Sequence, residues 1–283
     1  HAGARSSLEK LLDTKARIAA IEILTPIAEA EGDYDRQLKF TLIRAKESDD
    51  ALEKSDLFRR AAEIAESGLD DAVQAFSLYT DAVRSGTSSP ELASMLDNIE
   101  RLAGRVDGHR TLTSLYADIA PDILDGALQV RCYLMVADTA CQVLKDTAMA
   151  REYYLKIMDT EADNDRAMNA LEDIYRSAGE YLELFEIYRQ KVHNTYDDAV
   201  KIQLLFKQAN VCEEHLKDLS SATQSYESIL EVDSANAEAI AALERLYPVE
   251  ERWTDLVELL ERRRAGEPRN RVELSHRLGM LVH

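Results

Sequence analysis

The sequence repeats itself at a fixed distance of 72 residues. Eight positions of one copy recur 72 residues later, seven with the same residue and one with another aromatic residue. The first set is Asp146, Ala150, Tyr154, Asn164, Ala170, Leu171, Tyr175 and Tyr181, and the second is Asp218, Ala222, Tyr226, Asn236, Ala242, Leu243, Tyr247 and Trp253. A self-match at a constant period indicates a repeat protein, in which each copy is one supersecondary unit that packs against its neighbours. No other feature of the chain limits its fold as strongly.

The repeat extends beyond this window to both ends of the sequence. Two columns carry four copies each: Tyr34, His109, Tyr181 and Trp253, and Leu24, Ile99, Leu171 and Leu243. We expect one array over residues 1–283, with copies at about 16–87, 88–163 and 164–234, a partial copy at 235–283, and a partial helix at 6–13. Because both ends cut through a copy, we interpret the sequence as a fragment of a longer array.

Each period contains four helical patterns joined by short connections. In the clearest, Asp165 to Ala178, the residues Ala167, Ala170, Leu171 and Ile174 follow the i, i+3, i+4, i+7 spacing of an amphipathic helix. The chain has only 10 Gly and 5 Pro in 283 residues, which favours helices over sheets. Short connections make successive helices antiparallel neighbours, so the sequence predicts an all-α array of helical hairpins. Pro26 lies inside the first helix of the first copy and is expected to kink or shorten it.

The two hairpins of each period, about 36 residues each, resemble tetratricopeptide repeats. Four kinds of position match that family's pattern. They are the turns Gly32-Asp33-Tyr34 and Gly179-Glu180-Tyr181, the small residues Ala137, Ala209, Ala150 and Ala222, the aromatic residues Tyr154 and Tyr226, and the closing segment 232–236. The resemblance implies a right-handed α-α superhelix, or solenoid, and the doubled period is similar to long arrays in large bacterial scaffold proteins. Armadillo-like or half-a-tetratricopeptide packing is the alternative.

Three features depart from the tetratricopeptide pattern. Ser234 replaces the family's closing proline, and Glu100 and Glu172 occupy a position of the first helix that is usually small. The turn between the third and fourth helices also carries one extra residue, which in the third copy is His215.

Charge and cysteine content exclude several classes of partner. The chain carries 53 acidic against 34 basic residues, a net charge of −19, which disfavours nucleic acid and anionic membranes. No run of about 18 apolar residues indicates membrane insertion. The 3 cysteines include no Cys-x-x-Cys pair, which argues against a zinc site or disulfide framework. A cytoplasmic location is expected, with the periplasm as the alternative.

No pattern of residues indicates catalysis. The sequence has no glycine-rich phosphate loop, no His-Glu-x-x-His and no Gly-x-Ser-x-Gly. His109 belongs to an aromatic column and is interpreted as a packing residue, and Tyr153, which aligns with Ser225, is expected at the surface. We therefore predict no enzyme activity, no catalytic or metal-binding residues and no cofactor.

The resemblance implies that partners bind the concave face, which the first helix of each hairpin lines. The residues that this register places there are Arg59, Glu63, Asp97, Arg101, Leu134, Asp138, Asn169, Asp173, Arg176, Phe206, Asn210 and Arg245. They mix both charge signs with apolar side chains, which suits an extended or helical segment of another protein. The Lys/Asn-rich clamp with which some family members hold a C-terminal carboxylate is not reproduced among them.

Three functions follow from these observations. The first is a non-catalytic protein-interaction scaffold that binds a protein or peptide segment. The second is a structural spacer or self-associating element of a larger protein. The third, a helical-toroid enzyme, is disfavoured because 1 Trp and 5 Phe provide little aromatic lining for a closed pocket.

Overall fold

The computed structural model describes residues 2–266, which are helical apart from short connections and contain no β-strand. The first nine α-helices are α1 (Ala2–Glu9), α2 (Arg17–Glu31), α3 (Tyr34–Glu47), α4 (Ala51–Glu63), α5 (Ala72–Ser85), α6 (Leu92–Val106), α7 (His109–Ile119), α8 (Gly126–Thr139) and α9 (Thr147–Thr160). The others are α10 (Asp165–Ala178), α11 (Tyr181–Asn194), α12 (Asp198–Val211), α13 (Leu219–Val232), α14 (Ala237–Val249) and α15 (Trp253–Gly266). Two short 3₁₀ segments, η1 (Lys10–Asp13) and η3 (Ala120–Asp122), follow α1 and α7.

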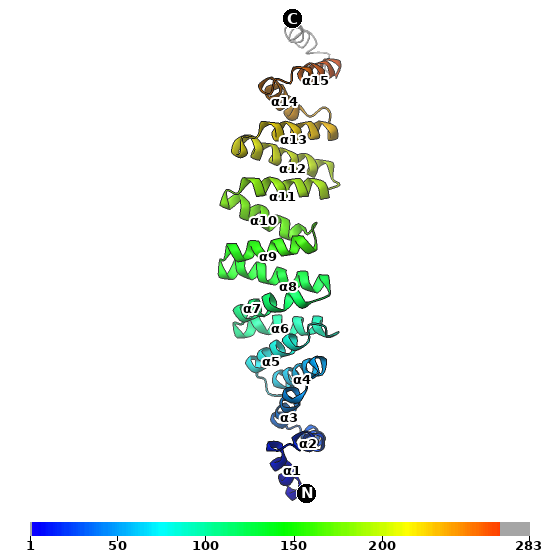
Figure 1. Cartoon of the computed structure of the whole chain (residues 1–283), viewed down its shortest axis with the longest axis vertical. Coiled ribbons are helices and arrows are strands. Elements are labelled where there is room, and N and C mark those ends of the chain that lie inside the picture. Colours follow the sequence, from blue (N-terminus) through cyan, green and yellow to red (C-terminus); the bar gives the residue numbers. More distant parts are fainter. Residues whose placement is uncertain (1, 267–283) are drawn as a thin grey trace. The chain divides into compact units, whose positions relative to one another are not determined.

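The chain divides into two compact units, His1–Thr160 and Glu161–His283. Within each unit, successive helices run back and forth and pack against their sequence neighbours (Figure 1). This confirms the predicted all-α fold of antiparallel helical hairpins. The division lies close to the expected boundary between the second and third copies, at 163–164. The part of the last copy after residue 266 lies outside the described residues.

Repeated polar residues begin the helices. Asp50, Asp125 and Asp197 are equivalent in three copies, and each accepts two backbone N–H bonds at the start of α4, α8 or α12. Asn164 and Asn236 each accept one backbone N–H bond at the start of α10 and α14, at 3.0 and 3.1 Å. Such caps satisfy backbone donors that have no partner inside the helix. Much of the sequence repeat therefore encodes helix boundaries.

Repeated small and aromatic residues form the core. Ala150 and Ala222 are fully buried on the fourth helices, and Tyr154 and Tyr226 lie one turn further along, 4% and 5% exposed. Small residues let neighbouring helices approach closely, and the aromatic ring fills the adjoining space. Cys212, like Ala140 in the preceding copy, is fully buried and fills a small-residue position, as predicted.

A π-helical turn follows each third helix. These turns are η2 (Ile64–Gly68), η4 (Ala140–Leu144) and η5 (Cys212–Leu216), which extend α4, α8 and α12. A π turn contains one residue more than an α turn, so it accommodates the extra residue that distinguishes this repeat from the tetratricopeptide pattern. In η5 the His215 ring stacks on Tyr181 of α11, with centroids 3.6 Å apart and planes 3° from parallel.

The expected surface position of Tyr153 is wrong, and so is the shortening that was one of the two effects expected of Pro26. Tyr153 is buried, 8% exposed, because its face of α9 packs on α8, where its ring lies 5.8 Å from that of Tyr133 and 4.1 Å from the Lys156 ammonium. Pro26 does not shorten its helix, since α2 continues to Glu31. Pro26 lies on the exposed side of α2, where water can bond the carbonyl that lacks an N–H partner.

Candidate functional site

Glu100 and Glu172, the two glutamates at a position that is usually small, accept hydrogen bonds from side chains on neighbouring helices. Glu100 of α6 accepts a bond from the Tyr116 hydroxyl of α7 at 2.9 Å and two from Arg131 of α8, at 2.9 and 3.2 Å. Glu172 occupies the equivalent place on α10, and the Tyr188 hydroxyl of α11 lies 3.2 Å away. A carboxylate can replace a small buried residue because these donors satisfy it.

Three cations surround Glu172. The residue is 7% exposed and accepts bonds from Lys191 of α11, Lys207 of α12 and Arg176 of its own helix, with Lys207 Nζ at 3.2 Å. The Lys191 side chain is only 11% exposed, and its ammonium also donates to Asn169 Oδ1 at 2.7 Å. The cluster thus joins three successive helices through one buried carboxylate.

The surroundings of Glu172 determine its ionisation. Burial of the carboxyl opposes loss of its proton, but the hydrogen bonds and charges of Lys191 and then Lys207 outweigh burial and hold the pKa of Glu172 at about 2. The group is therefore ionised at neutral pH, and Lys191 always has a charged partner there.

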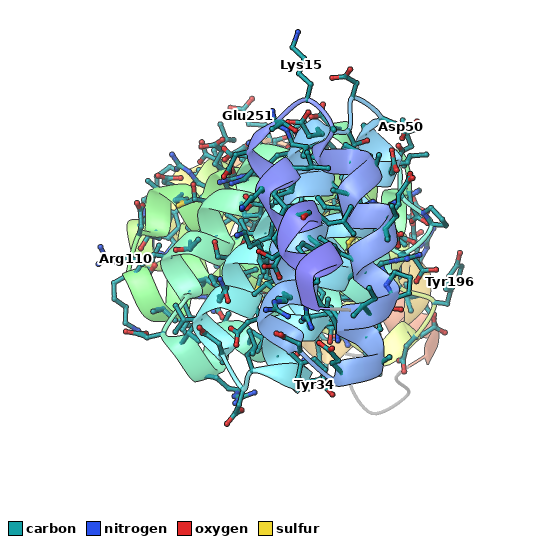
Figure 2. All side chains as sticks on the ribbon, turned by 90° about the horizontal axis from the view of Figure 1, so that it is seen from below. Lys15, Tyr34, Asp50, Arg110, Tyr196 and Glu251 are labelled. Atoms are coloured by element: carbon teal, nitrogen blue, oxygen red, sulfur yellow. The ribbon has the colours of Figure 1, made fainter. Side chains whose placement is uncertain are left out.

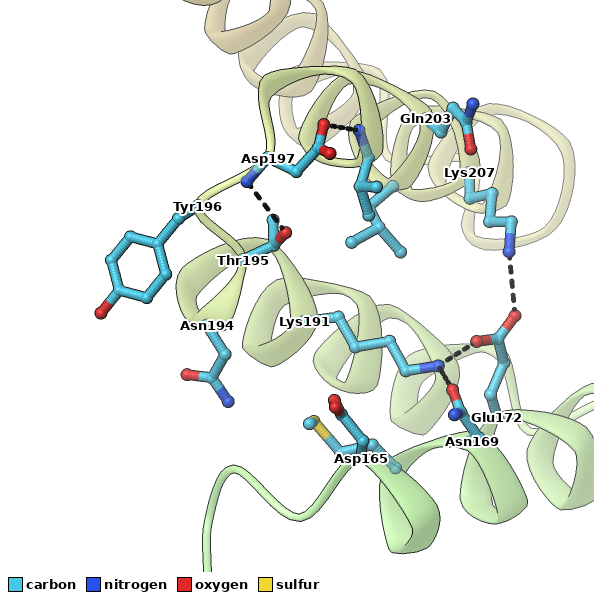
Figure 3. A pocket seen from close by; sticks show the side chains of 13 residues that line it. Asp165, Asn169, Glu172, Lys191, Asn194, Thr195, Tyr196, Asp197, Gln203 and Lys207 are labelled. Carbon is cyan, nitrogen blue, oxygen red and sulfur yellow. Dashed lines mark hydrogen bonds and ion pairs between the residues drawn. The ribbon is translucent and has the colours of Figure 1, made fainter.

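A pocket of about 530 Å³ opens beside this cluster, between α10, α11 and α12 (Figure 3). Its lining comprises the apolar side chains Met168, Val200 and Leu204, the polar residues Asn169, Asn194, Thr195 and Gln203, the acids Asp165, Glu172 and Asp197, the lysines Lys191 and Lys207, and Tyr196. Tyr196 lies in the loop between α11 and α12 and is fully exposed, with its ring projecting from the ribbon (Figure 2).

Differences between copies explain why the pocket is open here. Gln203 stands where the preceding period has Arg131, whose longer side chain reaches both Glu100 and Asp97. In the third copy the cations that reach the glutamate are instead Arg176, Lys191 and Lys207, whose equivalents are Gly104, Ile119 and Met135. The shorter Gln203 leaves unfilled the space that an arginine would occupy.

Most of the predicted site residues engage each other or neighbouring helices. Arg101 of α6 makes bonds of 2.6 and 2.8 Å to Glu66 of η2, which lower the pKa of Glu66, and Arg245 of α14 makes the equivalent pair with Glu213 of η5, at 2.6 and 2.9 Å. Arg59 contacts Asp56 and Glu63 within α4. The Arg101 and Arg245 pairs thus each link two neighbouring hairpins, whereas the Arg59 pairs stay within one helix.

The remaining predicted residues have varied surroundings. Asn169 lines the pocket, and Asp173 pairs with Arg176 at 3.1 Å beside it. Asp97 pairs with Arg131 at 2.6 Å, Asp138 accepts the Tyr154 hydroxyl at 2.7 Å, and Phe206 meets Tyr226 edge-on at 6.0 Å. Leu134 is half-buried and Asn210 is exposed. Arg59 also lines a smaller pocket of about 280 Å³ in the first unit, with Leu52, Pro90 and Met95.

Removing one exposed inter-hairpin pair should have little effect on stability. Arg245→Ala is expected to lower the free energy of unfolding by less than about 1 kcal/mol, because the Arg245 side chain is 57% exposed. Urea unfolding at low and at high salt measures this, and the difference from wild type should shrink as salt rises. A loss several times larger, unaffected by salt, would contradict this account of the pair.

Of the residues that line this pocket, the predicted site residues include only Asn169, and Lys191, Gln203, Lys207 and Tyr196 are among those that were missed. The available signal was the contrast between copies, since Lys191, Gln203 and Lys207 replace Ile119, Arg131 and Met135. Tyr196 replaces Leu124, which is also 93% exposed. Positions that change in chemical type between otherwise similar copies were thus the better guide to this pocket.

Between residues 2 and 266, no three His, Cys, Asp or Glu side chains are placed so that they could hold a metal ion. In the same part of the chain, no helix combines the length and apolar character needed to cross a bilayer.

Comparisons with known proteins give structural similarity at low sequence identity. No protein-family model matches the chain, and no curated protein matches it. Among solved structures, Naa15/Naa10 bound to HypK-THB is 14% identical with a TM-score of 0.43, over 94% of this chain and 39% of that one. A tetratricopeptide repeat protein from Parabacteroides merdae is 13% identical with a TM-score of 0.32, over 94% and 99%. The TPR2AB-domain:pHSP90 complex of yeast Sti1 is 13% identical with a TM-score of 0.29, over 86% and 89%. The chain thus spans well under half the length of the first of these proteins.

Proposed function

We propose that this protein is a non-catalytic interaction scaffold that binds a segment of a partner protein, and that the pocket between α10, α11 and α12 is its main contact. The observation that carries the proposal is a division of roles among positions. Most residues that repeat serve as helix caps and core. In contrast, Lys191, Gln203 and Lys207, which change between copies, line the pocket beside the repeated residues Glu172 and Asp197. A surface for one particular partner needs such individual residues.

The chemistry of the pocket suits a polypeptide. Asn169, Asn194, Gln203 and Thr195 offer donors and acceptors that can pair with a partner's backbone N–H and C=O groups. Val200, 42% exposed, and fully exposed Tyr196 add apolar area at the rim. Aromatic residues of this kind often contribute most of the binding energy at interfaces.

Peptide selection with matched variants tests the proposal. Random peptides displayed on phage are selected on the full chain, and their affinities are measured by fluorescence anisotropy. Lys207→Met, the residue of the preceding period, and Gln203→Arg, which should fill the pocket, are each expected to weaken binding by about fivefold or more. Lys201→Met, on the same helix but outside the pocket, should leave it unchanged.

Two outcomes would contradict the proposal. Selected peptides that bind all four proteins equally would place the contact elsewhere. Failure to select any peptide above a control with an unrelated helical repeat would leave the structural-spacer function as the better account.

A further inference from the structure

We infer that the pocket binds an extended segment carrying one acidic and one basic side chain about four to five residues apart, with an apolar residue between them. This inference rests on the proposed function and specifies the partner's chemistry. It follows from the arrangement of charges along α10 and α12, which are both antiparallel to α11 and hence parallel to each other.

One end of the pocket carries excess positive charge. Lys191, Arg176 and Lys207 together face two carboxylates, Glu172 and Asp173. Lys191 is held by Glu172 and Asn169, whereas the Lys207 side chain is 50% exposed and lies at the edge of the cluster (Figure 3). The Lys207 ammonium has three donors, so it can bind a partner's carboxylate while it still contacts Glu172.

The other end is acidic. Asp165 begins α10 and Asp197 caps α12, so both line the pocket at the N-terminal ends of these parallel helices. Tyr196 precedes Asp197, and its exposed ring can stack against a cation. A lysine or arginine of the partner would therefore meet two carboxylates and an aromatic face there, whereas an acidic residue would be repelled.

The middle of the pocket is apolar and fixes the spacing. Met168, Val200 and Leu204 line it between the two charged ends. Asp197 and Lys207 are ten positions apart on α12, which corresponds to roughly 15 Å along the helix axis. An extended chain advances about 3.3 Å per residue, so roughly four to five residues span that distance.

Four synthetic peptides of equal length test the charge pattern. The first has Glu and Lys five positions apart around a central Val, and the second has the same composition with the two charges adjacent. The third and fourth carry two Glu or two Lys at the spaced positions. We expect wild type to bind the first peptide about fivefold or more tightly than each of the others, with less difference at high salt.

Single variants assign each charge to its end of the pocket. Lys207→Met should remove the preference for Glu over Lys at one position, and Asp165→Asn should reduce the preference for Lys over Glu at the other. Asp165 is exposed in the first turn of α10, so its amide should disturb the fold little. Lys201→Met should retain every preference.

The outcomes separate this inference from the proposed function. Pocket-dependent binding of selected peptides, with equal affinity for the four charge patterns, would overturn the inference and leave the function standing. Selected peptides that bind the pocket while none of the four does would have the same meaning. Absence of binding by both sets would overturn the two together.

Discussion

Replacing Glu172 by leucine should lower the free energy of unfolding by about 3 kcal/mol at neutral pH. The substitution leaves the Lys191 ammonium, whose side chain is 11% exposed, without its charged partner, and an unpaired buried charge is strongly destabilising. Urea unfolding followed by circular dichroism measures the change. Asp173→Asn is the control on the same helix, because the Asp173 side chain is 79% exposed, and it should change the free energy by less than about 0.5 kcal/mol.

A double variant tests the cause of this loss. Lys191→Ile introduces the residue that the preceding period has at this position, Ile119, and removes the charge that Glu172→Leu leaves unpaired. The double variant should recover most of the lost stability, since replacing both members of a buried pair by apolar residues is often close to neutral. A double variant that loses as much stability as the two single variants together would show that Glu172 acts through packing and not through its charge.

Acid should remove the stabilisation that Glu172 provides. Its pKa is about 2 in the folded chain against an ordinary 4.5, so the stabilisation is fully present above about pH 4.5 and is lost as the pH falls toward 2. Glu172→Gln should cost about 2 kcal/mol at pH 7, a value reduced from the full shift because the Lys207 side chain is 50% exposed.

The measurement is the difference in unfolding free energy between wild type and Glu172→Gln at several pH values. Other carboxylates also titrate in acid, and the comparison cancels their contribution. The difference should be constant above about pH 5 and approach zero near pH 2. A difference that stays constant down to pH 2.5 would mean that the charge of Glu172 does not stabilise the fold.

The repeat predicted the helix boundaries well because many residues that recur between copies lie at helix ends and turns. The helix expected from Asp165 to Ala178 has those bounds in the structure. It begins after the Asn164 cap and is followed by Gly179, whose φ of 72° suits glycine. Caps, glycine turns and small residues act locally or between adjacent helices, so the sequence pattern carries them directly.

The position of the pocket could not be predicted from any one aligned position of the repeat. It arises because Lys191, Gln203 and Lys207 on two helices change together relative to Ile119, Arg131 and Met135. Whether such changes leave a space depends on side-chain length and on which cation reaches Glu172, and both require the packed structure. The single-copy register identified Asn169 and Arg176 but not the lysines between which Glu172 lies.

Tyr153 shows the opposite error, in which alignment between copies misled. Its partner in the alignment, Ser225, suggested a polar surface position. Ser225 is in fact 4% exposed, and its hydroxyl donates to the Ser221 carbonyl at 2.9 Å, so a serine is satisfied within its own helix. A hydroxyl that bonds its own backbone can be buried on the same face as a tyrosine ring.

The π turns after α4, α8 and α12 each take up one extra residue without changing which side chains of the next helix face the core. One extra residue inside a regular α-helix would rotate every later side chain by about 100° and move core residues into solvent. Here the additional residue is confined to a single wide turn, and a left-handed residue, Asp70, Lys145 or Lys217, follows before the next helix begins. The fourth helix of each copy thus starts with its alanine and tyrosine columns correctly oriented. A repeat with this device can be one residue longer without changing which of its faces point inward.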